Sequence, residues 1–83
     1  MATILVVEDD LTLNKGIMLT LREKDMDIEQ AYSIKQAKEM YNNKNIDLIL
    51  IDVNLPDGSG FDLCTEIRKT SKIPIIFLTA CDM

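Results

Sequence analysis

Three short runs of apolar residues, none interrupted by a polar side chain, limit most strongly what this chain can fold into. They lie at residues 4–7 (ILVV), 48–51 (LILI) and 75–78 (IIFL). A strand with one face in water alternates apolar and polar residues, whereas a strand covered on both faces reads as a continuous apolar run. We therefore expect these runs to be strands of a parallel sheet that helices cover on both faces.

The segments between the runs have the spacing of amphipathic helices. Apolar residues recur every four positions at Leu13, Ile17 and Leu21, after an aspartate suited to cap a helix, and similar stripes follow Ser33 and Gly60. We expect strands at residues 3–7, 27–31, 47–52 and 74–79, and helices at residues 11–24, 33–43 and 60–71. This alternation, with right-handed crossovers, predicts an open α/β sandwich.

Acidic and hydroxyl side chains follow three of the expected strands at the point where each strand ends. Glu8 and Asp9 come directly after the first run, Asp52 after the second and Thr79 after the third. Because the carboxyl ends of parallel strands meet at one edge, with neighbouring strands about 4.8 Å apart, these side chains should gather there. If the strand at 47–52 lies between the other two, Asp52 is central.

Carboxylates this close to one another predict a metal site. Their mutual repulsion raises at least one pKa unless a cation compensates the charge. Mg²⁺ takes oxygen ligands and usually keeps several waters, so a few protein ligands suffice. The expected ligands are Asp9, Asp52 and the backbone carbonyl of Asn54, with Glu8 acting through a water molecule.

A metal beside a carboxylate also makes phosphoryl transfer possible. A phosphoryl donor and ionised Asp52 are both negative, so they need positive charge between them to approach in line. Asp52 is then the nucleophile and forms an acyl phosphate. The Thr79 hydroxyl can donate to a phosphoryl oxygen, a contact that exists only after phosphorylation and that could act as a switch. Residues 53–60, with one proline and two glycines, are expected to form a loop that walls the site.

Each of these features has an ordinary explanation when it is taken alone. Acidic residues before a helix commonly cap it, aspartate starts many turns and threonine closes many strands. Their joint occurrence after three buried strands, at spacings that place them on one edge, favours a functional site.

The composition argues against several other classes. A net charge of −5 leaves no basic stripe for a phosphate backbone, so we expect no direct contact of this segment with nucleic acid. The two cysteines, Cys64 and Cys81, lack metal-ligand spacing, and the sequence has no histidine. No apolar stretch approaches the roughly 20 residues of a membrane span, and the N-terminus lacks a signal-peptide pattern. We therefore expect a cytoplasmic protein that does not contact a membrane.

Three blocks carry a family resemblance: residues 4–10 (ILVVEDD), 48–60 (LILIDVNLPDGSG) and 74–80 (PIIFLTA). In order and spacing they resemble the response-regulator receiver domains of bacterial two-component systems, in the subclass with a winged-helix output domain. The resemblance implies a flavodoxin-like three-layer sandwich with strand order 2-1-3-4, counted along the chain.

The same resemblance implies a role for each site residue. Asp52 matches the phosphoacceptor, which a sensor histidine kinase phosphorylates. Glu8 and Asp9 match the acidic pair that holds Mg²⁺ together with Asp52 and the carbonyl of Asn54, and Thr79 matches the switch hydroxyl. A domain of this kind is not an enzyme, and it controls a transcriptional output domain that this chain does not contain.

The chain departs from the family at its C-terminus. Receiver domains continue with a fourth helix, a fifth strand that bears a lysine, and a fifth helix, so residues 1–83 are expected to be the N-terminal portion of a receiver domain. Without those elements we expect self-association through the edge of the strand at 74–79 or through an uncovered sheet face. Without the lysine we expect phosphorylation of this chain to be slow or absent.

Three alternatives remain open at this point. A haloacid-dehalogenase-like phosphohydrolase also uses an aspartate at a strand end, but it places a second aspartate two positions later, where this chain has Asn54. A nucleotide-binding module would explain residues 48–52 as a Walker B strand, but no glycine-rich phosphate loop precedes them. The third alternative is an interaction fragment that no longer signals.

Overall fold

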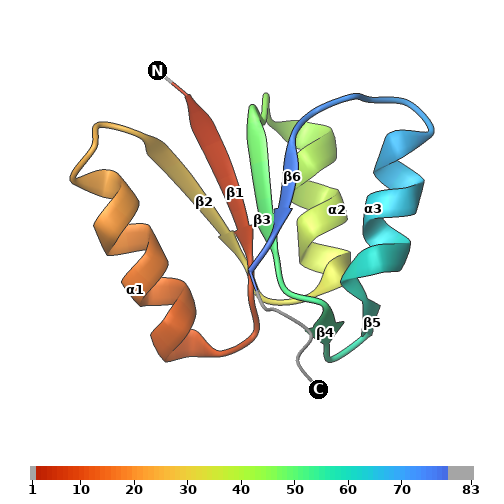
Figure 1. The fold of residues 1–83 in the computed structure, drawn as a ribbon, viewed down its shortest axis with the longest axis horizontal. Helices are drawn as coiled ribbons and strands as arrows, with labels where there is room; N and C mark the ends of the chain where they lie inside the picture. Colours follow the sequence, from red (N-terminus) through yellow and green to blue (C-terminus); the bar gives the residue numbers. More distant parts are fainter. Residues whose placement is uncertain (1, 79–83) are drawn as a thin grey trace.

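The computed structural model describes residues 2–78. In chain order the elements are β1 (Thr3–Val7), α1 (Leu11–Arg22), β2 (Asp27–Ala31), α2 (Ile34–Asn43), β3 (Leu48–Ile51), β4 (Asn54–Leu55), β5 (Gly58–Ser59), α3 (Gly60–Arg68) and β6 (Ile75–Phe77). Four parallel strands form the main sheet in the order β2-β1-β3-β6, while β4 and β5 pair as an antiparallel hairpin. Helix α1 lies on one face of the sheet, and α2 and α3 lie on the other (Figure 1). The predicted strand order is confirmed, because β6 is the fourth strand once the hairpin is set apart.

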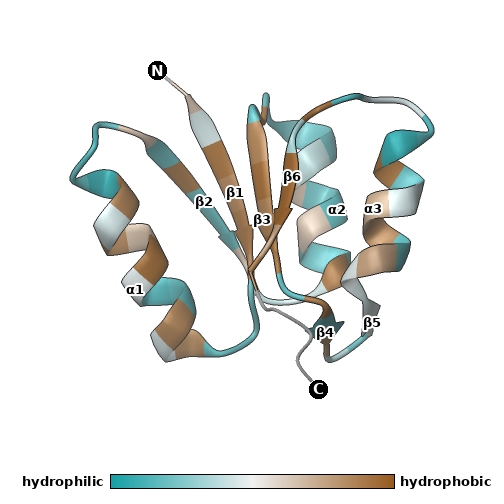
Figure 2. Ribbon diagram, viewed as in Figure 1, coloured by the Kyte–Doolittle hydropathy of each residue, from teal (hydrophilic) through white to brown (hydrophobic). Residues whose placement is uncertain are grey.

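The main core lies between the sheet and helices α2 and α3. Alternate residues of β1 and β3 face this layer because side chains alternate along a strand. The buried cluster consists of Leu5, Val7, Ala31, Ala37, Ile49, Ile51, Leu55, Leu63 and Ile67. Figure 2 shows β1, β3 and β6 as the most hydrophobic elements of the fold. Removing these side chains from water is the main force that holds the sheet and its edge in place.

The face under α1 is less well covered by the residues that the structure describes. Val6 is fully buried there, but Ile76 of β6 is 53% exposed and Leu13 of α1 is 46% exposed. An apolar groove runs along α1 and reaches Leu50 of β3. The expected burial on both faces is therefore wrong for β6, because α1 packs against β1 and β2 while β6 lies at the opposite edge of the sheet.

Two helices end earlier than the sequence spacing predicted. Helix α1 ends at Arg22 rather than at residue 24, and α3 ends at Arg68 rather than at residue 71. After α3, the N–H of Thr70 donates to the carbonyl of Ile67 (3.1 Å), three residues back. Such bonds tighten the last turn, so the helical spacing of the sequence continues beyond the α-helix itself. Within residues 2–78, no helix combines the length and the apolar character needed to cross a bilayer.

Residues 53–60, expected to be a loop, contain the β4–β5 hairpin. Asn54 pairs with Ser59, and Leu55 pairs with Gly58. Leu55 belongs to the buried core and anchors the hairpin to the body of the fold. A two-residue strand has no periodicity in the sequence, so only the turn between the strands could be predicted.

Candidate functional site

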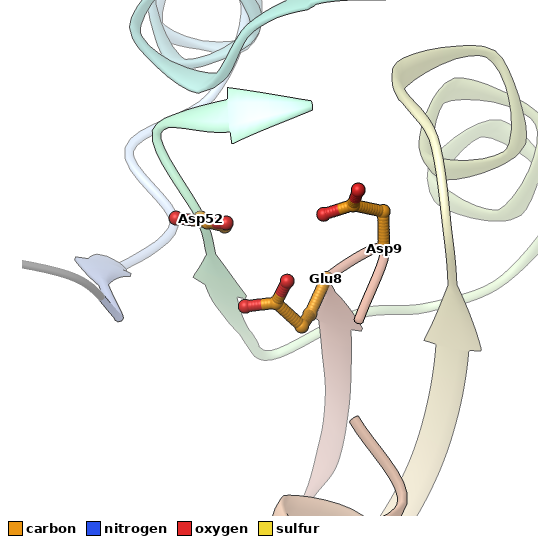
Figure 3. Close-up of side chains that lie close together, drawn as sticks. All are labelled: Glu8, Asp9 and Asp52. Carbon is orange, nitrogen blue, oxygen red and sulfur yellow. The ribbon is translucent and has the colours of Figure 1, made fainter. Parts of the chain in front are cut away.

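The ends of β1 and β3 bring three carboxylates together. Val7 is in register with Ile51, so Glu8 and Asp52 follow at the same level, and the N–H of Asp52 donates to the carbonyl of Val7 (2.9 Å). One carboxylate oxygen from each of Glu8, Asp9 and Asp52 lies within 4.8 Å of the other two. Figure 3 shows that the three side chains converge from the ends of these neighbouring strands.

Hydrogen bonds within the turn between β1 and α1 orient the Glu8 carboxylate. Oδ1 of Asp10 accepts from the N–H of Leu13 (3.1 Å), which confirms Asp10 as the N-cap of α1. Oε2 of Glu8 accepts from the N–H of Asp10 (3.0 Å). The start of the helix therefore fixes the direction in which the Glu8 carboxylate points.

Asn14 is a fully buried polar residue whose part in the site the sequence analysis missed. Its side-chain amide donates to the backbone carbonyls of Glu8 (2.9 Å) and Ala31 (3.2 Å), and its oxygen accepts from the Gln30 amide (2.9 Å). It thus ties the ends of β1 and β2 to the first turn of α1. Its only signal in the sequence is its place one turn after the capping Asp10, beside the apolar stripe.

The chain leaves Asp52 through a turn that requires glycine at position 60. The N–H of Gly60 donates to the carbonyl of Val53 (2.7 Å). A Cβ at Gly60 would collide with the carbonyl oxygen of Asp52 and would lie 3.2 Å from Cγ1 of Ile51. Helix α3 therefore begins in direct contact with the backbone of Asp52, and a larger residue would displace one of the two.

The roles of Asn54 and Thr79, like the metal-binding and phosphoacceptor roles of the three carboxylates, remain predictions. Asn54 is exposed and lies two residues after Asp52, at the start of β4. Its carbonyl remains a predicted metal ligand. Thr79 lies outside the described residues, which reach Leu78, where the N–H donates to the carbonyl of Ile51 (2.9 Å). The switch role of Thr79 likewise remains a prediction.

The three carboxylates lie in different environments. Glu8 is 3% exposed, Asp52 is half-buried and Asp9 is exposed. The pKa of Glu8 is raised from 4.5 to about 7, mainly by burial and also by the charges of Asp52 and Asp9, against the lowering effect of the Asp10 N–H. Near neutral pH the Glu8 carboxyl is therefore only partly ionised unless a positive charge is close by.

The donor set fits a magnesium ion. Carboxylate oxygens are the ligands that Mg²⁺ prefers, and water molecules usually complete its octahedron. A divalent cation would also offset the burial and repulsion that raise the pKa of Glu8. Glu8, Asp9 and Asp52 can thus share one ion without a change in the strands that carry them.

The sequence profile of the response regulator receiver domain matches residues 4–83. The chain belongs to this family. It is 38% identical over 80 residues to the response regulator ArlR of Staphylococcus saprophyticus, which covers 96% of this chain and 36% of that protein. It is 38% identical over 77 residues to the uncharacterized transcriptional regulatory protein YrkP of Bacillus subtilis, covering 93% of this chain and 33% of that protein. This receiver chain spans about a third of the length of the curated relatives it matches.

A solved receiver structure supports the same assignment. The response regulator TrrA of Thermotoga maritima, in complex with Mg²⁺ and beryllium fluoride, is 32% identical with a TM-score of 0.87, covering 93% of this chain and 68% of that chain. The flavodoxin-like receiver fold predicted from the resemblance is confirmed. Receiver domains of two-component response regulators are signalling proteins rather than typical enzymes, and they interact with histidine kinases and bind Mg²⁺ at an acidic pocket.

Proposed function

We propose that this receiver chain accepts a phosphoryl group on Asp52 from a sensor histidine kinase, in a reaction that requires Mg²⁺. One observation carries the proposal: Glu8, Asp9 and Asp52 converge within 4.8 Å at the carboxyl edge of the sheet. Asp9, Asp52 and the carbonyl of Asn54 would hold the ion, with Glu8 acting through water. Bound Mg²⁺ would supply the positive charge that a phosphoryl donor and a carboxylate need between them.

The chemistry at Asp52 is a transfer of one phosphoryl group. A carboxylate oxygen of Asp52 attacks the phosphorus in line, the bond between phosphorus and the donor imidazole nitrogen breaks, and the ring, which carries a proton on its other nitrogen, leaves as neutral imidazole. The β1–β3 ladder and the contact between Gly60 and the Asp52 backbone fix the position of the backbone that carries the nucleophile, which favours an in-line approach. The Thr79 hydroxyl would then donate to the bound phosphoryl group and report its presence.

We also propose a place for this chain in a longer protein. Residues 1–83 would be the N-terminal portion of a receiver domain, and phosphorylation would control a transcriptional output domain, as the name of the relative YrkP suggests. The net charge of −5 supports the proposal that a different domain, and not this segment, makes any contact with DNA. This role is that of a cytoplasmic signalling domain and not of a phosphohydrolase, because Asn54 stands where those enzymes have a second aspartate.

Self-association of this chain is a separate proposal. Ile76 is 53% exposed on β6, which among the described strands pairs only with β3. An exposed apolar strand at a sheet edge tends to pair with another copy. Either that edge or the open face beside α1 would form the contact. Sedimentation at increasing concentration should show a dimer or a larger species, and a monomer at every concentration would contradict the proposal.

The test of phosphorylation uses acetyl phosphate as the donor and intact mass as the readout. Because phosphorylation of this chain is expected to be slow at best without the lysine, we expect the wild-type chain to gain at most one hydroxylamine-labile phosphoryl group during long incubation with Mg²⁺, and none in EDTA. The Asp52→Asn variant should gain none in either buffer. Labelling of that variant, labelling without Mg²⁺, or absence of both labelling and Mg²⁺ binding in the wild type would contradict the proposal.

A further inference from the structure

The tip of the β4–β5 hairpin is bound to the beginning of α2 by one side chain. Oδ1 of Asp57 accepts from the N–H of Ile34 (2.8 Å), and Oδ2 accepts from the N–H of Lys35 (3.0 Å). Helix α2 already has a cap of its own, because Oγ of Ser33 accepts from the N–H of Gln36 (3.2 Å). The carboxylate of Asp57 therefore joins two distant segments of the chain in addition to satisfying donors at a helix start.

Packing and charge both stabilise this contact between the hairpin and α2. A Cβ at Gly58, where φ is +153°, would lie 2.8 Å from Cδ1 of Ile34, so the hairpin tip rests directly on the first residue of α2. The N–H groups of Ile34 and Lys35 hold the pKa of Asp57 below its ordinary value of 3.8. Asp57 is therefore ionised at neutral pH, and its negative charge is favourable at the positive end of the helix dipole.

The contact between Asp57 and α2 connects the segments that surround the carboxylate cluster into one ring, here called the frame. The residue that ends β2 just before this helix start is Ala31, whose carbonyl accepts from the N–H of Glu8 (3.0 Å). On the other side, the hairpin leads back along the chain to Asp52. Glu8 and Asp52 are thus connected twice, once through the β1–β3 ladder and once through the start of α2 and Asp57.

We propose that Asp57 is a positioning residue for the metal site. By holding the hairpin tip on α2, it sets where the segment after Asp52, with the carbonyl of Asn54, stands relative to Glu8 and Asp9. The inference rests on the proposed function, since it concerns the ligands of Mg²⁺. Asp57 itself touches neither the ion nor the phosphoryl group in this role; it acts through the backbone of the hairpin.

The experiment compares three variants by Mg²⁺ titration, followed through backbone amide resonances, with urea unfolding measured in parallel. Asp57→Ala removes both contacts to α2. Asp57→Asn keeps one oxygen acceptor and should therefore keep part of the contact between the hairpin and α2. Ser33→Ala is the matched control, because it removes a cap from the same helix but leaves the contact between the hairpin and α2 in place.

We expect Asp57→Ala to weaken Mg²⁺ binding by roughly 3- to 10-fold. Loss of a group that holds a metal ligand directly typically weakens metal binding by about 10- to 100-fold, and Asp57 acts less directly. Asp57→Asn should fall between Asp57→Ala and the wild type, and Ser33→Ala should bind Mg²⁺ as the wild type does while it unfolds at lower urea. Wild-type affinity in Asp57→Ala, or an equal loss in Ser33→Ala, would overturn the positioning role alone. Failure of the wild type itself to bind Mg²⁺ would overturn the proposed function and this role with it.

Discussion

Replacing Glu8 by glutamine should stabilise the metal-free protein at alkaline pH. Glu8 is 3% exposed, and its pKa is raised to about 7, mainly by burial. Glutamine has nearly the same shape and keeps an oxygen that can accept from the N–H of Asp10, but it carries no charge. The substitution therefore removes the cost of ionising this buried group and changes little else.

The magnitude follows from the shift of the Glu8 pKa from 4.5 to about 7. At about 1.4 kcal/mol per pKa unit, the charged form costs the folded state on the order of 3 kcal/mol. Because the folded pKa lies above the unfolded one, the unfolded chain releases its proton first as the pH rises. Stability is therefore lost between about pH 4.5 and pH 7, and the loss is complete above that range. Relative to wild type, Glu8→Gln should be equally stable at pH 4 and about 3 kcal/mol more stable at pH 8.

The assay is urea unfolding in EDTA, followed by circular dichroism from pH 4 to pH 8. Glu39→Gln, on the exposed side of α2, is a control that removes a carboxylate far from the cluster and should show no such pH-dependent gain. Added Mg²⁺ at pH 8 should stabilise the wild type and largely cancel the advantage of Glu8→Gln. A Glu8→Gln variant that is no more stable than wild type at pH 8, or whose advantage does not change with pH, would refute the reasoning.

Three other substitutions, with a fourth as a control, test the residues that form and support the site. Gly60→Ala should destabilise the fold by about 1–3 kcal/mol in urea, because its Cβ meets the Asp52 carbonyl. Gly16→Ala, with nothing within 4 Å of the added carbon, should be neutral or stabilising, and equal losses would contradict the contact. Asn14→Leu should cost about 2 kcal/mol or more, because the carbonyls of Glu8 and Ala31 each lose the buried Asn14 amide as a donor and the Gln30 amide loses its acceptor; unchanged unfolding would argue against this role of Asn14. Asp9→Asn, at an exposed position, should leave stability in EDTA nearly unchanged but abolish the thermal shift caused by Mg²⁺, and a retained shift would remove Asp9 from the ligand set.

The sheet was predictable because its strands are continuous apolar runs, and the carboxylates were predictable because they stand where those runs end. The strand order came from the family resemblance, since apolar runs alike in composition do not specify which neighbours they pair with. The exposure of Ile76 could not be read from its apolar run alone; only the family resemblance, with its further strand and helix, led us to expect an open edge and an uncovered sheet face here. The hairpin at residues 54–59 was beyond prediction, since its strands are only two residues long.

The residues that support the cluster were missed for a different physical reason. Asn14 and Asp57 act through hydrogen bonds to backbone groups up to 23 residues away, and no local pattern encodes such a distance. The same two residues explain how the site can change charge without losing its shape. An amide does not titrate, and the pKa of Asp57 is held below its ordinary value, whereas the pKa of Glu8 is raised to about 7. Near neutral pH, proton or metal binding therefore alters the charge at Glu8, while the frame that spaces Glu8 from Asp52 keeps the same charge and the same hydrogen bonds.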